Sequence, residues 1–320
     1  MNFLVLGGNG FIGSHLVDEL ASNNNNFVRS VDRGMNNSLA RVNVEYIKGD
    51  FNNKQLLDEI LADIDIVYDT IWTTIPSNDN AIYDIESNVV PTLQLLNKCV
   101  ENKIKKIIFT SSGGTIYGNP MEIPISEKHP TNPICSYGIS KLTIEKYLQL
   151  YFEKYNLNYA VLRCSNPFGE RQNYLRNQGL IITLLYKAII NEPFHVWGDG
   201  TVVRDYIYIK DLADAHVKVA AYRGTEKMFN IGSGIGLSIN ETIHLINNTL
   251  DIKVPILYEE ERKCDVEKNI LNIERAKNEF NWCPEISIEE GIVKTWEWLN
   301  KTVDEFEVLS EVVATSEGDK

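Results

Sequence analysis

The chain has 320 residues, 43% of them hydrophobic, and its formal net charge at pH 7 is −13. This length and composition are typical of a globular protein that can bury a large core. The acidic balance argues against a nucleic-acid partner and against an anionic membrane surface, because both would repel the protein. A small anionic ligand held in a locally basic cleft is compatible with this charge.

The five cysteines are scattered along the chain and show no Cys-x-x-Cys spacing. Neither a zinc site nor a disulfide framework is indicated, and reduced thiols are the simplest interpretation. Residues 3–6 are too short for the apolar part of a signal peptide, and no apolar run has the length that spans a bilayer. We therefore expect a cytoplasmic protein with no metal site and no membrane contact.

The first predicted element is a buried strand over residues 3–6, followed by a glycine-rich turn and an amphipathic helix. Glycines at this spacing allow a tight turn and let backbone N–H groups approach a pyrophosphate at the helix N-terminus. The predicted cofactor-binding residues of this turn are Gly7, Gly10, Phe11, Ile12 and Gly13.

A second predicted strand, over residues 27–31, ends at Asp32 and completes a βαβ unit of the length that dinucleotide-binding proteins use. A carboxylate at this place accepts hydrogen bonds from the adenosine ribose and repels a 2′-phosphate. The sequence therefore favours NAD over NADP, a preference that the neighbouring Arg33 tempers.

Helical and strand patterns then alternate along the chain. Helices are predicted over residues 56–61 and from about 87 to 100, between strands at 44–47, 64–68 and 107–109. Strands separated by helices predict a parallel, doubly wound sheet with ligands at the carboxyl ends of its strands. The segments that fall at such ends are residues 49–51, 70–76 and 111–115.

Tyr137 and Lys141 follow the Ser-Ser-Gly-Gly-Thr stretch at 111–115 and open a segment with helical periodicity. In a helix their Cβ atoms lie roughly 6 Å apart on one face. The ammonium can then stabilise the ionised phenol, whose pKa is otherwise about 10, and the pair becomes a base near neutral pH. Tyr206 and Lys210 have the same spacing in a predicted strand, where they are ~13 Å apart and cannot couple. For the pair alone, an interfacial Tyr and a solvated Lys are the alternative.

Taken together, these motifs resemble the extended short-chain dehydrogenase/reductase superfamily and, more narrowly, UDP-glucose 4-epimerase and related NAD-dependent nucleotide-sugar epimerases. The resemblance covers residue 1 to about 300, with the motifs in the family's order. The resemblance rests on the glycine turn, Gly49-Asp50, the Ser/Thr-rich strand end, Tyr137-x-x-x-Lys141 and Arg163-x-Ser165-Asn166-Pro167-x-Gly169.

The expected fold is α/β, a doubly wound parallel (Rossmann) sheet with a smaller mixed α/β C-terminal substrate domain. The NAD-binding domain is expected over residues 1–166, with residues 203–222 returning to it. The nucleotide-sugar-binding domain is expected mainly over residues 167–302. Residues 303–320 carry six acidic side chains against one Lys and predict a solvated, largely disordered tail.

The resemblance implies the remaining cofactor contacts. Asp50 and Phe51 are expected at the adenine, Asn88 in support of the loops around the cofactor, and Lys141 on the nicotinamide ribose. Tyr137 becomes the catalytic base, and the positive charge of a nicotinamide ring would lower its pKa further. Ser111 and Pro167 complete the expected cofactor-binding set.

The second half of the chain is expected to hold the substrate. By the resemblance, Asn166 bonds a diphosphate oxygen, and Arg204 and Arg262 bind the diphosphate, for which paired guanidinium groups are suited. A surface role for these arginines and core packing for Trp197 are the alternatives. The other implied contacts are Gly179 and Leu180 at a helix start, His195 and Trp197 on the uridine side, and Asp265 at the ribose.

Two positions depart from the pattern of relatives. Many relatives carry a Ser or Thr at the place of Gly113, so its hydroxyl role toward the sugar must pass to Thr115, to Ser112 or to water, and we favour Thr115. The 4,6-dehydratases carry an Asp-Glu pair at the places of Gly114 and Thr115. Neither Gly nor Thr can do that proton transfer near pH 7, which disfavours dehydration.

The expected reaction inverts C4 of a nucleotide-activated hexose, most simply a UDP-sugar, through a transient 4-keto sugar, with NAD as a tightly held cofactor. A 4-reductase or 4,6-dehydratase on the same scaffold is the alternative, and a non-catalytic NAD-binding regulator is a further one. Asn269 leaves glucose, acetamido and uronic forms open. The family also implies a homodimer through the helices that begin near Ser87 and Tyr137.

Overall fold

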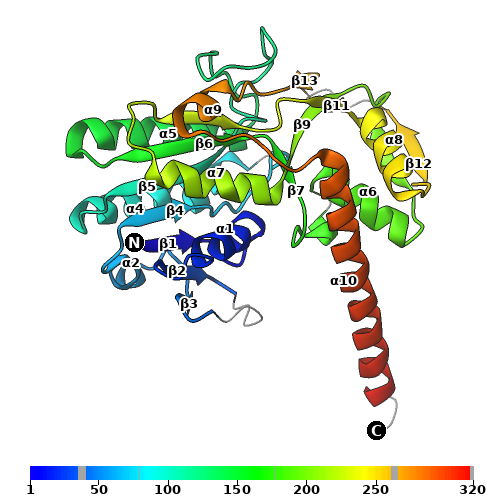
Figure 1. Ribbon diagram of the computed structural model, residues 1–320, viewed down its shortest axis with the longest axis horizontal. Coiled ribbons are helices and arrows are strands. Elements are labelled where there is room, and N and C mark those ends of the chain that lie inside the picture. The colour runs from blue at the N-terminus through cyan, green and yellow to red at the C-terminus, as the bar shows by residue number, and fades with distance from the viewer. Residues whose placement is uncertain (35–40, 79, 177, 261–265, 318–320) are drawn as a thin grey trace.

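A seven-stranded parallel sheet forms the larger part of the structure (Figure 1). The computed structural model describes residues 1–34, 41–78, 80–176, 178–260 and 266–317. The strand order is β10-β6-β5-β4-β1-β2-β3. Its strands are β1 (Asn2–Leu6), β2 (Phe27–Asp32), β3 (Val44–Lys48), β4 (Ile66–Asp69), β5 (Lys106–Ser112), β6 (Tyr159–Cys164) and β10 (Met228–Ile231).

Helices cover both faces of this sheet, so the predicted doubly wound fold is confirmed (Figure 1). Phe3 and Val5 of β1 pack toward α1 (Phe11–Ala21) and α7 (Ile209–Ala221), whereas Leu4 and Leu6 pack toward the opposite layer. This alternation follows from the two-residue period of a strand. The opposite layer consists of α2 (Lys54–Leu61), α4 (Val90–Glu101) and α5 (Ser136–Tyr155).

The strand order reverses between β1 and β4, because β2 and β3 extend the sheet in one direction and β5 and β6 in the other. In an open parallel sheet, such a reversal leaves a crevice outside the carboxyl ends of the strands. The glycine turn after β1, the loop after β4 and the serine-glycine stretch after β5 all open at this edge.

A smaller mixed unit follows the larger sheet. In it, β9 (Val203–Tyr208) pairs with β7 (Asn166–Phe168), β11 (Gly236–Ser238) and β13 (Lys268–Asn269), while β8 (Phe194–Trp197) pairs with β12 (Ile256–Glu259). Its helices include α6 (Leu180–Ile189) and α8 (Ile239–Leu250). The smaller mixed unit predicted from the sequence is therefore present. Helix α9 (Glu274–Phe280) lies beside β10 of the larger sheet.

The segment 203–222 divides between the two parts. Helix α7 packs against α1 and the larger sheet, whereas β9 is the centre of the smaller sheet. Strand β10, which the sequence analysis did not assign, adds the outermost strand beside β6. The functional division at residue 166 stays a prediction.

The final helix, α10 (Ile288–Glu317), runs into the segment expected to be a disordered tail, and the disorder of that tail stays a prediction. No Gly or Pro lies between Gly291 and Gly318, so nothing in the backbone interrupts the helix that begins at Ile288. The acidic charge pattern alone did not reveal this continuity. In Figure 1 the C-terminal part of α10 projects away from both sheets.

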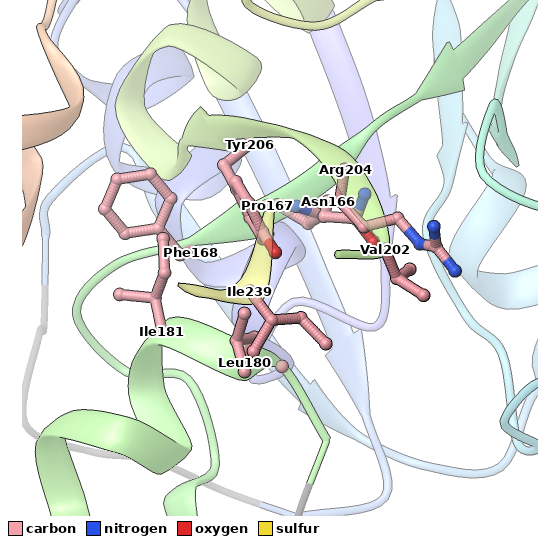
Figure 2. A pocket seen from close by; sticks show the side chains of 10 residues that line it. Asn166, Pro167, Phe168, Leu180, Ile181, Val202, Arg204, Tyr206 and Ile239 are labelled. Carbon is pink, nitrogen blue, oxygen red and sulfur yellow. The ribbon is translucent and has the colours of Figure 1, made fainter. Parts of the chain in front are cut away.

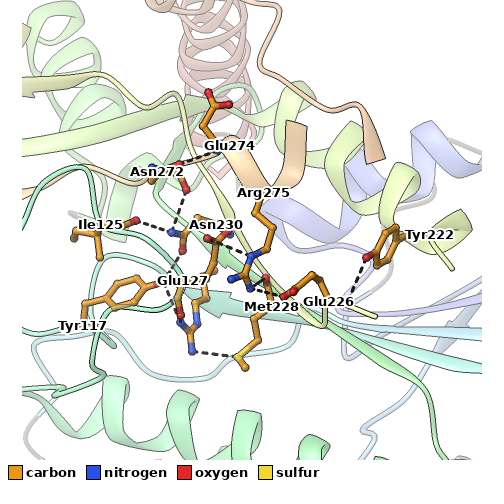
Figure 3. A network of polar contacts seen from close by, with 11 residues as sticks. Tyr117, Ile125, Glu127, Tyr222, Glu226, Met228, Asn230, Asn272, Glu274 and Arg275 are labelled. Carbon is orange, nitrogen blue, oxygen red and sulfur yellow. Dashed lines mark hydrogen bonds and ion pairs between the residues drawn. The ribbon is translucent and has the colours of Figure 1, made fainter. Parts of the chain in front are cut away.

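A buried polar network fixes the long segment between β5 and α5, as Figure 3 shows. The Asn230 side chain of β10 donates hydrogen bonds to the carbonyl oxygens of Ile125 (2.8 Å) and Asn272 (3.2 Å). Its Oδ1 accepts one from the Tyr117 hydroxyl (2.7 Å), and its backbone N–H donates to Glu127 (2.9 Å). Because buried polar groups are costly unless paired, this network holds the segment in one arrangement.

His216 is a fully buried neutral imidazole that joins α7 to β5. Its Nδ1 lies 2.8 Å from the carbonyl oxygen of Leu212, an acceptor that requires an N–H there. Its Nε2 therefore accepts the hydrogen bond from the Thr110 hydroxyl, at 2.9 Å. Burial lowers the pKa of His216 from 6.5 to about 4.

We predict that His216 makes the protein less stable as the pH falls from 6.5 toward 4. In this window the unfolded imidazole binds a proton that the native imidazole does not, so the free energy of unfolding decreases, by up to about 3 kcal/mol. Urea unfolding should therefore depend less on pH in His216→Gln than in the wild type. His244→Gln, at an exposed imidazole of α8, is the control, and equal slopes for His216→Gln and wild type would contradict the prediction.

Candidate functional site

The glycine turn between β1 and α1 closes tightly enough to admit no side chain. Gly7 has φ +84°, a conformation that favours glycine, and a Cβ on Gly13 would lie 2.0 Å from the Gly7 carbonyl oxygen. The backbone N–H of Gly10 donates to the same oxygen at 2.9 Å. The first N–H groups of α1 point out of this turn, which makes it a cradle suited to a pyrophosphate.

Asp32 lies beside this turn at the end of β2. Its carboxylate accepts hydrogen bonds from the backbone N–H groups of Asn9 (3.2 Å) and Gly34 (3.1 Å). Asp50 follows β3 and accepts from the backbone and side chain of Asn52, at 3.0 and 2.8 Å. The structure thus brings Asp32, the carboxylate predicted to bind the ribose, next to the glycine cradle. Asp50 lies just after the adjacent strand β3.

Asn88 fastens the loop after β4. Its Oδ1 accepts hydrogen bonds from the backbone N–H and the hydroxyl of Thr73, at 2.9 and 3.0 Å. Its Nδ2 donates to the carbonyl oxygen of Asp84 at 3.2 Å, and the Thr74 hydroxyl donates to the Asp84 carboxylate. These contacts hold the loop after β4 in place, and the role of Asn88 around a cofactor stays a prediction.

Tyr137 and Lys141 lie in the first turns of α5, and the net effect of the surroundings of Tyr137 disfavours the ionised phenol. Burial, with Cys164 and Cys135 nearby, raises the pKa of Tyr137. The Lys141 ammonium donates to the carbonyl oxygen of Thr110 at 2.6 Å, and its Nζ lies 5.9 Å from the centre of the Tyr137 ring. Burial dominates the pKa of Tyr137, and helical spacing does not report desolvation, so the action of the pair as a base near neutral pH stays a prediction.

Two residues of this site were not singled out from the sequence. Asp69, the last residue of β4, is 1% exposed, and burial raises the pKa of its carboxyl group while Lys141 opposes that rise. Burial likewise lowers the pKa of Lys141, and Asp69 opposes it. Trp72 places its ring over the Lys141 ammonium, 3.7 Å from ring centroid to Nζ. A charged residue ending an apolar strand was the signal that could have drawn attention to Asp69.

Ser112 is the hydroxyl that acts on the phenol. Its side chain opposes the rise in the pKa of Tyr137 that burial causes. Thr115, which the sequence analysis favoured for this role, has a buried Oγ1 without a hydrogen-bond partner among the described residues. The geometry therefore favours Ser112 over Thr115 as the partner of Tyr137.

Gly113 owes its identity to packing. A Cβ at this position would lie 2.5 Å from the Leu271 side chain and 3.0 Å from the Arg163 carbonyl oxygen. Asn269 of β13 also donates a hydrogen bond to the Gly113 carbonyl oxygen at 3.0 Å. The close approach of the β13 region to the end of β5 thus removes the room for the Ser or Thr that many relatives carry there.

Ser111 is held by a buried ion pair behind the site. Arg163 and Glu145 are joined at 2.6 Å, and both side chains are almost completely buried. The Ser111 hydroxyl donates to the other oxygen of Glu145 at 2.6 Å. Ser111 therefore faces the interior pair rather than the phenol, and its role is to fix the end of β5.

A cavity of about 240 Å³ lies between β7, α6 and β9 (Figure 2). In Figure 2, Asn166 and Arg204 lie on one side of it, with Leu180 and Ile239 facing them. Asn166 donates to the Asp205 carbonyl oxygen at 2.9 Å, and Arg204 donates to the Val266 carbonyl oxygen at 2.6 Å. The predicted residues that the structure brings together here are Asn166, Pro167, Gly179, Leu180 and Arg204.

Other predicted substrate contacts do not line this cavity. His195 pairs with Glu259 across β8 and β12 at 2.7 Å, and Trp197 is 43% exposed, which excludes simple core packing for it. Arg262 and Asp265 lie outside the described residues. The uridine and ribose assignments of these four residues stay predictions.

Two further features bear on function: clusters of side chains that could hold a metal ion, and helices that could span a membrane. Within the residues that the structure describes, no group of three or more His, Cys, Asp or Glu side chains is placed to hold a metal ion. None of the described helices combines the length and the apolar character that crossing a bilayer requires.

The family model of the NAD-dependent epimerase/dehydratase family matches residues 3–232, more than two thirds of the chain. The chain belongs to this family. The relationship predicted from the glycine turn and the Tyr-Lys pair is thereby confirmed, and so is the use of NAD that the family's description states.

The similarity to known proteins covers nearly the whole chain. A Methanocaldococcus jannaschii protein named as a candidate UDP-glucose 4-epimerase is 34% identical over 301 residues, 92% of this chain and 97% of that protein. A dTDP-4-dehydro-6-deoxyglucose reductase of Escherichia coli is 33% identical over 302 residues, covering 91% and 95%. The crystal structure of UDP-glucose 4-epimerase from Thermotoga maritima with UDP-glucose superimposes with a TM-score of 0.88 at 33% identity, over 95% of this chain and 100% of that one.

Proposed function

We propose that the protein is an NAD-dependent epimerase that inverts C4 of a nucleotide-activated hexose, with UDP-sugars as the substrate class. The observation that carries the proposal is the Tyr137 phenol at the carboxyl edge of the sheet, with the Lys141 ammonium 5.9 Å from the centre of its ring. The similarity to proteins named UDP-glucose 4-epimerase supports the choice of reaction.

The glycine cradle and Asp32 suit NAD. The turn formed by Gly7, Gly10 and Gly13 would receive the pyrophosphate, and the Asp32 carboxylate would accept hydrogen bonds from the adenosine ribose. When bound, NAD supplies a reversible hydride acceptor together with a positive charge near the phenol.

Tyr137 is the group that moves the proton. As phenolate it takes the proton of the C4 hydroxyl, and it returns that proton to the keto oxygen when the opposite configuration forms. Ser112, whose side chain lowers the pKa of the phenol, would bridge the phenol to the sugar oxygen. Because burial raises the pKa of Tyr137, the phenolate needs a cation, and the Lys141 ammonium provides one from within the chain.

The 240 Å³ cavity supports a division of the site into one part that anchors the diphosphate and another in which the sugar can turn. Asn166 and Arg204 would hold the diphosphate at that cavity, in the smaller unit, while the reacting sugar lies toward Ser112 in the larger one. Epimerisation requires the 4-keto sugar to present both faces at one place, so the hexose must be held less tightly than the diphosphate.

A 4-reductase of a nucleotide-activated 4-keto sugar is the second candidate. It is favoured by the Escherichia coli relative named dTDP-4-dehydro-6-deoxyglucose reductase. Both reactions use the same phenol, and they differ in whether the cofactor stays bound after one turnover.

The purified protein should interconvert C4 epimers of at least one UDP-sugar. Incubation with a panel of UDP and dTDP sugars, without added cofactor, should give the C4 epimer by NMR, and Tyr137→Phe should be slower by a factor of about 10² to 10⁴. No epimer with any sugar, together with stoichiometric NADH oxidation on a dTDP-4-keto sugar, would replace the epimerase by the reductase.

Ser112 should matter more to turnover than Thr115. In Ser112→Ala the phenol loses the hydroxyl that lowers its pKa, so kcat should fall by a factor of ten or more, about 1.4 kcal/mol in the barrier. Thr115→Val keeps the shape of the side chain and should change kcat by less. If Thr115→Val is the more damaging substitution while both variants melt like the wild type, the hydroxyl role belongs to Thr115 after all.

We also infer a homodimer through α3 (Ala81–Asp84), α4 and α5. Helix α3 lies against α5, and these helices, together with the π-helical turn Ile85–Val89 between α3 and α4, expose apolar side chains to solvent, which is typical of an interface. Sedimentation should give a dimer for the wild type and a monomer for Ile85→Glu. Leu257→Glu, on β12, is the control and should stay dimeric. A monomeric wild type would contradict the inference. The exposed apolar residues are Ile82, Tyr83, Ile85, Val90 and Ile139.

A cytoplasmic location is the accompanying inference. The thiols of Cys99, Cys135, Cys164 and Cys283 are free in the structure, as expected in a reducing compartment. Cell fractionation that placed the protein outside the cytoplasm would overturn it.

A further inference from the structure

The Lys141 ammonium is enclosed mainly by aromatic rings. Its side chain is 4% exposed. The Trp72 ring centroid lies 3.7 Å from Nζ and the Phe109 ring centroid 4.7 Å away, and the Thr110 carbonyl oxygen accepts a hydrogen bond at 2.6 Å. A buried ammonium is costly, so the groups that face it determine whether it stays charged.

Trp72 is fixed in its place over the ammonium. Its indole N–H donates to the Thr74 hydroxyl at 3.0 Å, and that hydroxyl donates to the buried carboxylate of Asp84. Its ring meets the Tyr137 ring edge-on, with 5.5 Å between ring centres. The indole therefore contacts both members of the Tyr-Lys pair from the loop after β4.

No carboxylate takes the place that Trp72 occupies. Among the described residues Lys141 forms no ion pair within 4 Å. Asp69 faces it from β4, but the recorded hydrogen bonds of its carboxylate come from the Ile71 backbone N–H (3.3 Å) and the Thr92 hydroxyl (3.5 Å). The other ionisable groups that act on Lys141 are Glu145 of its own helix and Cys164 of β6, and Tyr137 lies one turn away.

An aromatic face and a carboxylate differ in how much positive charge remains at the site after they have bound a cation. The face stabilises the cation through its quadrupole and does not neutralise it. A carboxylate in the same place would cancel the positive field that a neighbouring phenolate needs. An indole is also the strongest of the aromatic faces for this purpose.

We propose that Trp72 is a positioning residue that holds the Lys141 ammonium charged and aligned beside Tyr137. It acts through Lys141, so it is not itself a catalytic residue. The effect on the ammonium is independent of the reaction, whereas the effect on turnover rests on the proposed function.

The charge of Lys141 can be measured directly by NMR of lysine labelled with ¹³C at Cε, with Lys141→Arg identifying the signal. Loss of the aromatic face in Trp72→Leu removes stabilisation of the charged form, so the titration midpoint of Lys141 should move to lower pH by about one unit. Trp72→Phe keeps a weaker face and should show a smaller shift. Trp296→Leu, the same change on α10, should leave the midpoint unchanged.

Turnover gives the second readout. In Trp72→Leu the alkaline limb of the kcat profile should move to lower pH by the same amount, with Trp72→Phe in between. An unchanged Lys141 midpoint in both Trp72 variants would overturn the proposal, and if Trp72→Leu does not fold, Trp72→Phe decides alone. A shifted midpoint in a protein that epimerises no sugar would uphold the role of Trp72 and count against the proposed function.

Discussion

The site depends on keeping a buried ammonium charged next to a half-buried phenol. Burial lowers the pKa of Lys141 and raises that of Tyr137, so desolvation disfavours the charged form of both groups. The protein offsets this with partners on several elements: the Thr110 carbonyl of β5, the Trp72 ring after β4 and the Asp69 carboxylate at the end of β4. The ends of two adjacent strands and the start of α5 must therefore stay in register for the chemistry to work.

Tight backbone packing provides that register. Gly13 lies against the Gly7 carbonyl, and Gly113 lies against Leu271, so a side chain at either glycine would separate the elements that meet there. The second contact joins residues far apart in the chain, and the hydrogen bond from Asn269 to Gly113 reinforces it. The smaller unit thus takes part in shaping the end of β5.

Local patterns were enough to predict the glycine cradle, the alternation of strands and helices, and the helical placement of Tyr137 and Lys141. They did not predict what tertiary packing decides. Helical spacing brought Tyr137 and Lys141 to one face but was silent about desolvation, which set the direction of the phenol's pKa. The resemblance, with Gly113 in place of a Ser or Thr, favoured Thr115 for the hydroxyl role, whereas Ser112 is the hydroxyl that acts on the pKa of the phenol. Trp72 and β10 were missed because their importance lies in contacts with distant segments.

The surroundings of Tyr137 also bear on which reaction the scaffold can support. A 4,6-dehydration needs a further acid and base beside the phenol. Asp84 is the carboxylate that acts on Tyr137, but it is completely buried and bound to the Thr74 hydroxyl, where it anchors the loop that carries Trp72. Releasing it for proton transfer would loosen the aromatic cover of Lys141. The same carboxylate cannot serve both purposes, and this favours chemistry that asks for one proton-transferring group, as oxidation and reduction at C4 do.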